Sequence, residues 1–262
     1  MEKNYFFNDI RTVCEREIRH FLKNKYSITI GITQPILWFL LLGFGMNGFL
    51  SNSSEIGTIM GTENYITYIV PGILIMTTMT GGLFSGAGFV NDLNTNAIDK
   101  LLSMPIVRES ILLGKLIFAL MQTFIQIILV LLIAIFLGAN ISLGWETFFA
   151  ILIALIFCAQ MFSVGAIVAM KLKSHQSVYS FLGILNIPLI FTSSAFFPAE
   201  TMPIAMKMIS YINPLTYAVN VARDMILIQN TYAGLNFLIL SIETVIALGL
   251  SMFVFRVEYN GK

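Results

Sequence analysis

LIFALMQTFIQIILVLLIAIFLGANISLGW, residues 116–145, is a run of 30 residues without a single Asp, Glu, Lys or Arg. Four further charge-free runs have 29, 28, 24 and 26 residues and lie at 26–54, 64–91, 147–170 and 174–199. A helix needs about 20 apolar residues to cross the hydrocarbon core of a bilayer, which is about 30 Å thick. Every backbone polar group must be paired there, and a helix does this within one segment. The chain is therefore predicted to be an all-α integral membrane protein.

Composition supports the same class of protein. The 262 residues are 57% hydrophobic and 11% charged, whereas about 25% of the residues of soluble domains are charged. The formal net charge of +1 provides no basic field, so no nucleic-acid partner is expected. We expect residues 1–25 to form a cytoplasmic amphipathic helix and residues 26–262 to form one membrane domain, without room for a soluble catalytic domain.

Six membrane-spanning helices are predicted. They lie at about 26–50, 64–90, 111–138, 146–170, 178–197 and 232–255. Lys and Arg accumulate in cytoplasmic loops. Thirteen of the fifteen basic residues lie in 1–25, 91–115, 171–177 and 256–262, and the opposite loops hold only Lys207 and Arg223. Both termini are therefore expected on the cytoplasmic side of the cell (plasma or inner) membrane.

A seventh span at 214–230 is the alternative topology. Arg223 and Asp224 lie at the middle of this stretch, and a charge at the centre of a spanning helix costs about 3 kcal/mol. We therefore expect residues 203–228 to form short outer helices that lie near the membrane surface or dip into it. Asn213 followed by Pro214 is a favourable N-cap and first-turn pair for one of them.

The leading segment combines an apolar stripe with a basic face. The stripe consists of Phe6, Ile10, Val13, Glu17 or Ile18, Phe21 and Leu22, at helical spacing. Such a helix is predicted to lie flat on the inner leaflet. A solvated helical extension is the alternative.

The cytoplasmic loop 91–110, NDLNTNAIDKLLSMPIVRES, carries an apolar stripe among its charged residues. The stripe consists of Ile98, Leu101, Leu102, Met104 and Ile106. An exposed apolar stripe in such a loop needs a cover, which is either the bilayer or another protein. A self-packed loop is the alternative. Pro105 is expected to end a short helix near Met104.

Two features lie inside the predicted spans. Glycines of the second span permit close approach of a neighbouring helix; they are Gly72, Gly81, Gly82, Gly86 and Gly88.

Glu243 is the only acidic residue well inside an apolar run, and an intramembrane carboxylate is by default a functional candidate. The alternative is a structural role in which Glu243 pairs with Arg223 or with water.

No catalytic or metal-ligating constellation is present in the sequence. His20 and His175 are isolated, and no phosphate-binding G-x-x-x-x-G-K-[ST] loop occurs. The chain is not expected to be an enzyme. If ATP energy is used, another chain must bind the nucleotide.

Three segments resemble one family, the permease subunits of type-2 ATP-binding-cassette (ABC) exporters, in particular the daunorubicin-resistance-like multidrug branch. They are YITYIVPGIL at 65–74, VNDLNTNAIDKLLSMPIVRESILLGKLI at 90–117, and FFPAETMP with YINPLTYAVNVARDMIL within 196–227. The outer-loop motif of the family is carried by Asn213, Pro214, Leu215, Thr216, Tyr217 and Arg223. The chain departs from the pattern where Asn94, Thr95 and Asn96 replace a Gly-containing turn.

The resemblance implies that two permease subunits pair, as two copies or as two homologous permeases. Each would dock on a separate ATPase subunit that binds MgATP. Loop 91–110 would contain the coupling helix, with the leading helix beside it. The implied contacts with the ATPase are Asn96, Ile98, Asp99, Leu101, Leu102, Met104, Pro105 and Arg108.

The resemblance also implies a transport pathway between spans two and five of the two copies, within the membrane lipid. The candidate lining residues are Thr77, Thr80, Phe84, Asn186, Phe191 and Thr192. Apolar side chains dominate the spans and no buried basic cluster is present in the sequence, which favours a hydrophobic or amphipathic substrate such as a drug, antibiotic or lipid. A lipid-linked polysaccharide is the alternative within the superfamily.

Two hypotheses from other classes stay open. An ion-coupled secondary carrier would use Glu243 and need no ATPase. A membrane anchor or sensor subunit would tolerate substitutions along the candidate pathway.

Overall fold

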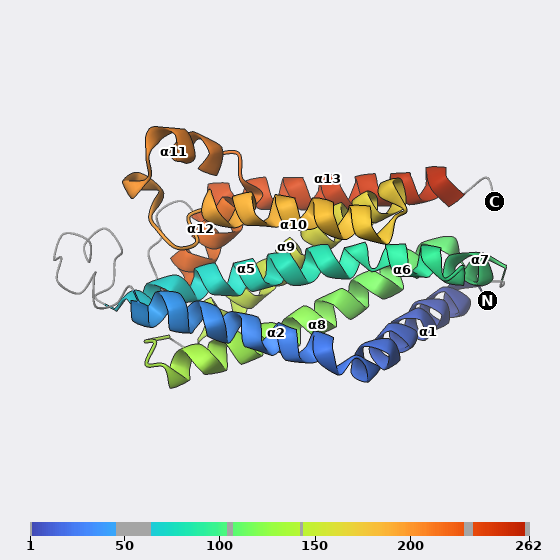
Figure 1. Cartoon of the computed structure of the whole chain (residues 1–262), viewed down its shortest axis with the longest axis horizontal. Helices are drawn as coiled ribbons and strands as arrows, with labels where there is room; N and C mark the ends of the chain where they lie inside the picture. The colour runs from blue at the N-terminus through green and yellow to red at the C-terminus, as the bar shows by residue number, and fades with distance from the viewer. Residues whose placement is uncertain (1, 46–63, 104–106, 142–143, 228–232, 260–262) are drawn as a thin grey trace.

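The computed structural model describes residues 2–45, 64–103, 107–141, 144–227 and 233–259. These residues form helices joined by turns, and none of them lies in a strand, which confirms the expected all-α class. The elements are α1 (Glu2–Lys23), α2 (Lys25–Trp38), the π-helical η1 (Phe39–Phe44), α5 (Tyr65–Ala87), α6 (Phe89–Asn94), α7 (Ala97–Leu102), α8 (Arg108–Phe136), α9 (Trp145–Leu172), α10 (His175–Phe191), the 3-10 helix η2 (Ala199–Thr201), α11 (Ile204–Ser210), α12 (Pro214–Ile226) and α13 (Ala233–Tyr259). The long helices run side by side as one bundle (Figure 1).

Within the described part of the chain, four helices are long and apolar enough to cross a membrane. They are Tyr65–Asn94, Arg108–Phe136, Trp145–Leu172 and Gly234–Tyr259, and they overlap the predicted spans 64–90, 111–138, 146–170 and 232–255. The other two predicted spans coincide with shorter helices. Span 26–50 overlaps α2 and η1, and its residues 46–50 lie outside the described residues. Span 178–197 overlaps α10, which ends at Phe191. The count of six spans stays a prediction.

Helix α5 forms the centre of the bundle and contacts α8, α9, α10 and α12. Its residues 65–79 are all buried, because this helix is apolar on every side and is covered on every side. Small residues bring its backbone against α9. A Cβ atom at Gly86 would lie 2.1 Å from the carbonyl oxygen of Phe162, and one at Gly165 would lie 2.1 Å from that of Leu83. Close helix packing is confirmed for Gly82 and Gly86, whereas Gly72 meets the backbone of Ala195 in the turn after α10.

Adding one methyl group at this contact is expected to destabilise the bundle. Gly86→Ala places a carbon inside the van der Waals radius of the Phe162 carbonyl oxygen, so the two backbones must separate. Overpacking of this kind costs about 2 kcal/mol, which corresponds to a fall in Tm of about 4–8 °C. Thermal unfolding in a mild detergent measures it.

The matched control is Gly249→Ala in α13, where a Cβ would meet no atom within 4 Å. Alanine favours a helix over glycine by about 1 kcal/mol, so this control is expected to keep or raise Tm. Equal Tm values for the two variants would show that the close α5–α9 contact contributes little to stability.

The two ends of the bundle carry different elements. The start of α1, the helix α7 and the end of α13 lie at one end, and α11 and α12 lie at the other (Figure 1). This arrangement agrees with the predicted topology, in which segments 1–25, 91–115 and 256–262 share one side.

Helix α12 is packed inside the bundle, against α5, α9 and α13. Leu215, Val219, Arg223 and Asp224 are all buried. With 13 residues this helix is about 20 Å long, too short to cross a membrane. This length argues against a seventh span, and the placement of α12 relative to the membrane stays a prediction. The preceding α11 is mostly exposed.

Helix α1 covers the beginning of α8. Val13 and Cys14 are buried, and a Cβ at Gly114 would lie 2.7 Å from the Cβ of Val13. Part of the predicted apolar stripe is therefore covered by α8, while Leu22, which also belongs to the stripe, stays exposed. The placement of α1 on a leaflet stays a prediction.

Candidate functional site

The first candidate site is the end of the bundle that carries α7. Helix α5 continues into α6, and a turn at Thr95 and Asn96 reverses the chain into α7. Asn96 has a φ of 52°, in the left-handed region that Asn tolerates better than other non-glycine residues. This explains the departure from the Gly-containing turn of the family, because Asn96 takes the conformation that glycine would supply.

The side chains of α7 divide between an inner and an outer face. Ile98 is only 1% exposed and belongs to the core, and Leu101 packs partly against it. Asn96, Lys100 and Ser103 are exposed. The expected exposure of Ile98 is therefore wrong, because this side chain holds α7 on the bundle.

The remaining implied ATPase contacts are placed only in part. Asp99 and Leu102 lie on α7, but their side chains lie outside the described part of the structure, as do Met104 and Pro105 entirely. Arg108 begins α8 and is half-buried. Contact of any of these residues with an ATPase stays a prediction.

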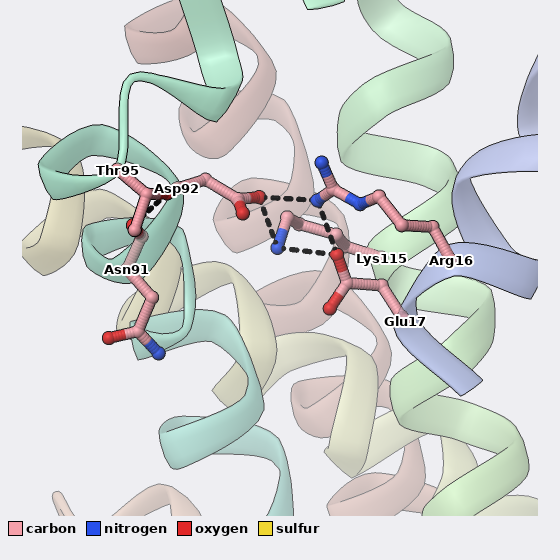
Figure 2. Close-up of polar contacts among 6 residues, drawn as sticks. All are labelled: Arg16, Glu17, Asn91, Asp92, Thr95 and Lys115. Carbon is pink, nitrogen blue, oxygen red and sulfur yellow. Dashed lines mark hydrogen bonds and ion pairs between the residues drawn. The ribbon is translucent and has the colours of Figure 1, made fainter. Parts of the chain in front are cut away.

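An ion-pair cluster joins α1, α6 and α8 beside α7 (Figure 2). It consists of Arg16 and Glu17 from α1, Asp92 from α6 and Lys115 from α8. Arg16 Nη2 lies 2.5 Å from Glu17 Oε1 and 2.6 Å from Asp92 Oδ2. Lys115 Nζ lies 2.7 Å from Asp92 Oδ2 and 3.0 Å from Glu17 Oε1. Two cations and two carboxylates therefore form a closed ring in which every neighbour has the opposite charge.

The ion-pair cluster is largely shielded from solvent. The Lys115 side chain is only 4% exposed, and its Nζ also lies 5.1 Å from the centroid of the Phe89 ring, within cation–π range. Burial lowers the pKa of Arg16, but hydrogen bonding to Glu17 and the charge of Asp92 outweigh this, so the pKa of Arg16 lies above its ordinary value. Removal of one partner from such a cluster leaves an uncompensated charge with little water around it.

Three further contacts hold the start of α8, directly after the segment that contains α7. The backbone N–H of Val107 donates to Asp9 Oδ2 of α1 at 3.1 Å. Arg108 Nη1 donates to the carbonyl oxygen of Tyr259, at the end of α13, at 2.6 Å. Arg256 of α13 pairs with Glu109 at 3.1 Å. The segment that contains α7 is thus held between α1 on one side and α13 on the other.

Sequence reasoning missed the ion-pair cluster, although two signals were present. Asp92 and Lys115 are the charges that directly border charge-free runs, at the ends of the loop. Glu17 falls on the apolar stripe of the leading helix, where a charge needs a buried partner. The two signals together point to contacts between the leading helix and the borders of the loop.

The candidate pathway residues lie on the neighbouring helices α5 and α10 and in the turn after α10. Thr77 is buried, and its hydroxyl donates to the Ile73 carbonyl of its own helix at 2.7 Å. The hydroxyl of Thr80 does the same with Met76 at 3.0 Å. Both hydroxyls therefore already have an acceptor within α5.

An aromatic contact connects α5 with α10, and a buried amide oxygen lies on α10. The Phe84 ring stacks on that of Tyr179, with centroids 5.9 Å apart. Asn186 Oδ1 is buried and accepts no hydrogen bond from the described residues. Phe191 is 54% exposed, and exposed Ile184 and Ile187 continue the outer face of α10. This face is left uncovered in the single chain.

The outer-loop motif closes the opposite end of the bundle. Asn213 caps α12 by accepting from the N–H of Leu215 at 3.0 Å, with Pro214 in the first turn, as expected. Its Nδ2 donates to the Leu189 carbonyl at 2.7 Å and to Thr192 Oγ1 at 3.0 Å. Asn213 therefore ties the start of α12 to the end of α10.

Other motif residues complete this contact. Thr216 Oγ1 lies 3.1 Å from Ser210 Oγ, Leu215 is fully buried and the Tyr217 hydroxyl donates to the Tyr211 carbonyl. Buried Arg223 donates to the carbonyls of Ser194 and Ala195 at 2.8 and 3.2 Å. Its guanidinium also lies 4.1 Å from the centroid of the Tyr68 ring. The motif is a structural clamp for the 190–196 turn.

Glu243 pairs with an amide and not with Arg223. Gln160 Nε2 of α9 donates to Glu243 Oε2 at 3.1 Å, and Thr244 donates to Gln160 Oε1 at 3.4 Å. The pairing with Arg223, one of the two partners considered under a structural role, is not formed, because Arg223 donates to two backbone carbonyls instead.

Comparison with known proteins agrees with the resemblance found in the sequence. Residues 8–227 match the family model described as ABC-2 type transporter. The chain is 30% identical over 226 residues to a putative transport permease, ycf38, of Cyanophora paradoxa, covering 84% of this chain and 74% of that one. It is 27% identical to the putative transport permease ycf38 of Pyropia yezoensis, with coverages of 82% and 72%. It is 21% identical to the daunorubicin resistance ABC transporter permease protein DrrB1 of Streptomyces coeruleorubidus, with coverages of 79% and 70%.

Proposed function

The chain belongs to the ABC-2 type transporter family, and from this we propose that it is the membrane permease of an ATP-driven exporter whose ATPase is a separate subunit. The relatives are transport permeases and not enzymes by name. MgATP would bind to the ATPase subunit, and two permeases, identical or homologous, would form the pathway in the cell membrane with both termini cytoplasmic.

The observation that carries the proposal is the way α7 is held. Helix α6, which precedes α7, is joined to α1 and α8 through the ion-pair cluster, and the start of α8, which follows α7, is joined to α13 through Arg108 and Tyr259. An ATPase subunit that pushes on the exposed face of α7 when it closes around ATP would therefore move three long helices together. Because α5 continues into α6 and packs tightly on α9, the same push reaches the central helix. Such a movement is what alternating access requires.

We propose a hydrophobic or amphipathic substrate, such as a drug, an antibiotic or a lipid. The support is the resemblance to a daunorubicin resistance permease and the apolar, aromatic character of the α10 face around Phe191 and Ile184. A second permease on that face would place Phe84, Asn186 and Phe191 near the contact. Asn186 Oδ1 is buried without a hydrogen-bond donor among the described residues, so a substrate would reach it only after α10 moves.

A steric block at α7 tests the proposal. In a Lys100→Cys variant, the exposed thiol on α7 is labelled with a large maleimide polymer before reconstitution with the ATPase subunit. Substrate-stimulated ATP hydrolysis is expected to fall at least about tenfold. A loss of about 1.4 kcal/mol in the binding free energy between permease and ATPase already weakens their association tenfold. Cys14 and Cys158 are buried, so labelling is directed to the new thiol.

The matched control is Met208→Cys on α11, which is 64% exposed at the opposite end of the bundle. The same polymer there is expected to leave hydrolysis unchanged. Unchanged hydrolysis after labelling at position 100 would remove α7 as the coupling element and count against the proposed function.

A further inference from the structure

A pocket of about 470 Å³ opens beside the ion-pair cluster, between α1, α6 and the start of α8. Arg19, His20 and Lys23 line it from α1, and Asn91 and Thr95 line it from α6 and the following turn. The residues of the ion-pair cluster line it as well (Figure 2). The pocket is thus built from three segments that are far apart in the sequence.

The pocket carries an excess of positive charge. It is lined by Arg16, Arg19, Lys23 and Lys115 but by only two carboxylates, those of Glu17 and Asp92. The two carboxylates are already bound by Arg16 and Lys115 in the ion-pair cluster. Arg19 and Lys23 are exposed and form no ion pair with another residue that the structure describes. Two cations therefore remain available to a ligand.

The charge pattern indicates the level of the pocket in the membrane. The charge-free run of α2 begins directly after Lys25, that of α5 ends at Asn91, and that of α8 begins after Lys115. Asn91 and Lys115 line the pocket, and Lys25 lies two residues after Lys23, which also lines it. Charged side chains avoid the hydrocarbon core, so the borders mark the zone in which lipid headgroups lie.

We propose that this pocket binds a phosphate-bearing anion, the headgroup of an acidic phospholipid. Basic pockets between helices at the inner surface of a membrane recognise such headgroups. Arg19 offers planar paired donors and Lys23 a compact ammonium group, and both suit phosphate oxygens. The binding site does not depend on which substrate the protein exports.

Lipid titration of the full-length protein in a neutral detergent tests the proposal. Phosphatidylglycerol and phosphatidylcholine are titrated separately, and the bound lipid is counted by native mass spectrometry. Wild type is expected to bind phosphatidylglycerol in preference to phosphatidylcholine. The double variant Arg19→Gln/Lys23→Gln is expected to bind phosphatidylglycerol about 30-fold more weakly, because each of the two basic residues contributes a factor of about five to six.

The matched control is Arg11→Gln/Lys25→Gln, which removes the same charge from the same segment at two exposed residues that do not line the pocket. Its affinity is expected to change less than about threefold. Thermal unfolding of both double variants confirms that each is folded. Equal weakening in the two variants, or none in either, would overturn the proposal, because binding would then depend on general surface charge or on another site.

Competition with inorganic phosphate separates the two sources of the ligand. Displacement of phosphatidylglycerol by phosphate in wild type would show that a soluble phosphate is also accepted. If phosphate does not displace phosphatidylglycerol, the lipid itself is needed for binding. Both results support the pocket when the Arg19→Gln/Lys23→Gln variant loses binding, and failure of wild type to bind either ligand overturns it.

Discussion

Lys115→Met is expected to lower the Tm of the protein by about 6–12 °C, corresponding to about 3 kcal/mol of lost stability. Lys115 is 4% exposed and neutralises both Asp92 and Glu17. Methionine has a similar length and fills the same space, but it leaves two carboxylates with Arg16 as their single cation. The remaining negative charge is shielded from water, and burial of an uncompensated charge is costly.

Thermal unfolding in detergent measures this effect, with Lys171→Met as the matched control. Lys171 is 56% exposed and lies 3.8 Å from Glu258, so its removal is expected to change stability by less than about 1 kcal/mol. Adding Asp92→Asn to Lys115→Met removes the surplus negative charge and is expected to recover part of the lost Tm. An unchanged Tm in Lys115→Met, or no recovery in the double variant, would contradict a stabilising role of the ion-pair cluster.

Arg223→Met is expected to have a destabilising effect of similar size at the opposite end of the bundle. The guanidinium is 7% exposed and satisfies the carbonyls of Ser194 and Ala195 while lying on the Tyr68 ring. Methionine leaves both buried carbonyls without this donor. Each hydrogen bond to a charged group contributes about 1.5–3 kcal/mol, so a fall in Tm of at least about 6 °C is expected.

Two controls separate the role of charge from that of geometry. Arg223→Lys keeps the positive charge but replaces the planar fork by a single ammonium group, so we expect an intermediate Tm. Arg256→Met removes an arginine that is 61% exposed and is expected to change Tm little. If Arg223→Met unfolded at the wild-type temperature, the outer-loop motif would not act as the clamp described above.

Features set by local sequence were predictable. The four long helices follow from the apolar runs, because an apolar run of about 20 residues can cross a bilayer and must form a helix there to pair its backbone polar groups. The cap at Asn213 follows from the Asn-Pro pair, because capping involves only neighbouring residues. The close contacts of Gly82 and Gly86 with α9 follow from the absence of a side chain. In each of these cases the deciding interaction lies within a few residues or depends on residue size alone.

Features set by distant pairs were not predictable in the same way. Arg16 and Asp92 are 76 residues apart in the chain, and their contact depends on how α1 folds back against α8. Glu243 meets Gln160 across 83 residues, whereas the sequence offered Arg223 as an equally reasonable partner. Ile98 falls on an apolar stripe, but only the packing of α7 determines which part of the stripe faces the core. The sequence marks Glu17, Asp92 and Lys115 as charges that need partners, but it does not determine which residue each of them meets.

The most direct test of the central claim, that the α7 end of this permease docks on an ATPase, is site-specific photo-crosslinking in intact membranes. A photo-reactive amino acid is placed at position 100 in α7 or at position 208 in α11, in cells that also produce the ATPase subunit. We predict a crosslink to the ATPase from position 100 and none from position 208. A crosslink from position 208, or none from position 100 while the two subunits still copurify, would contradict the account.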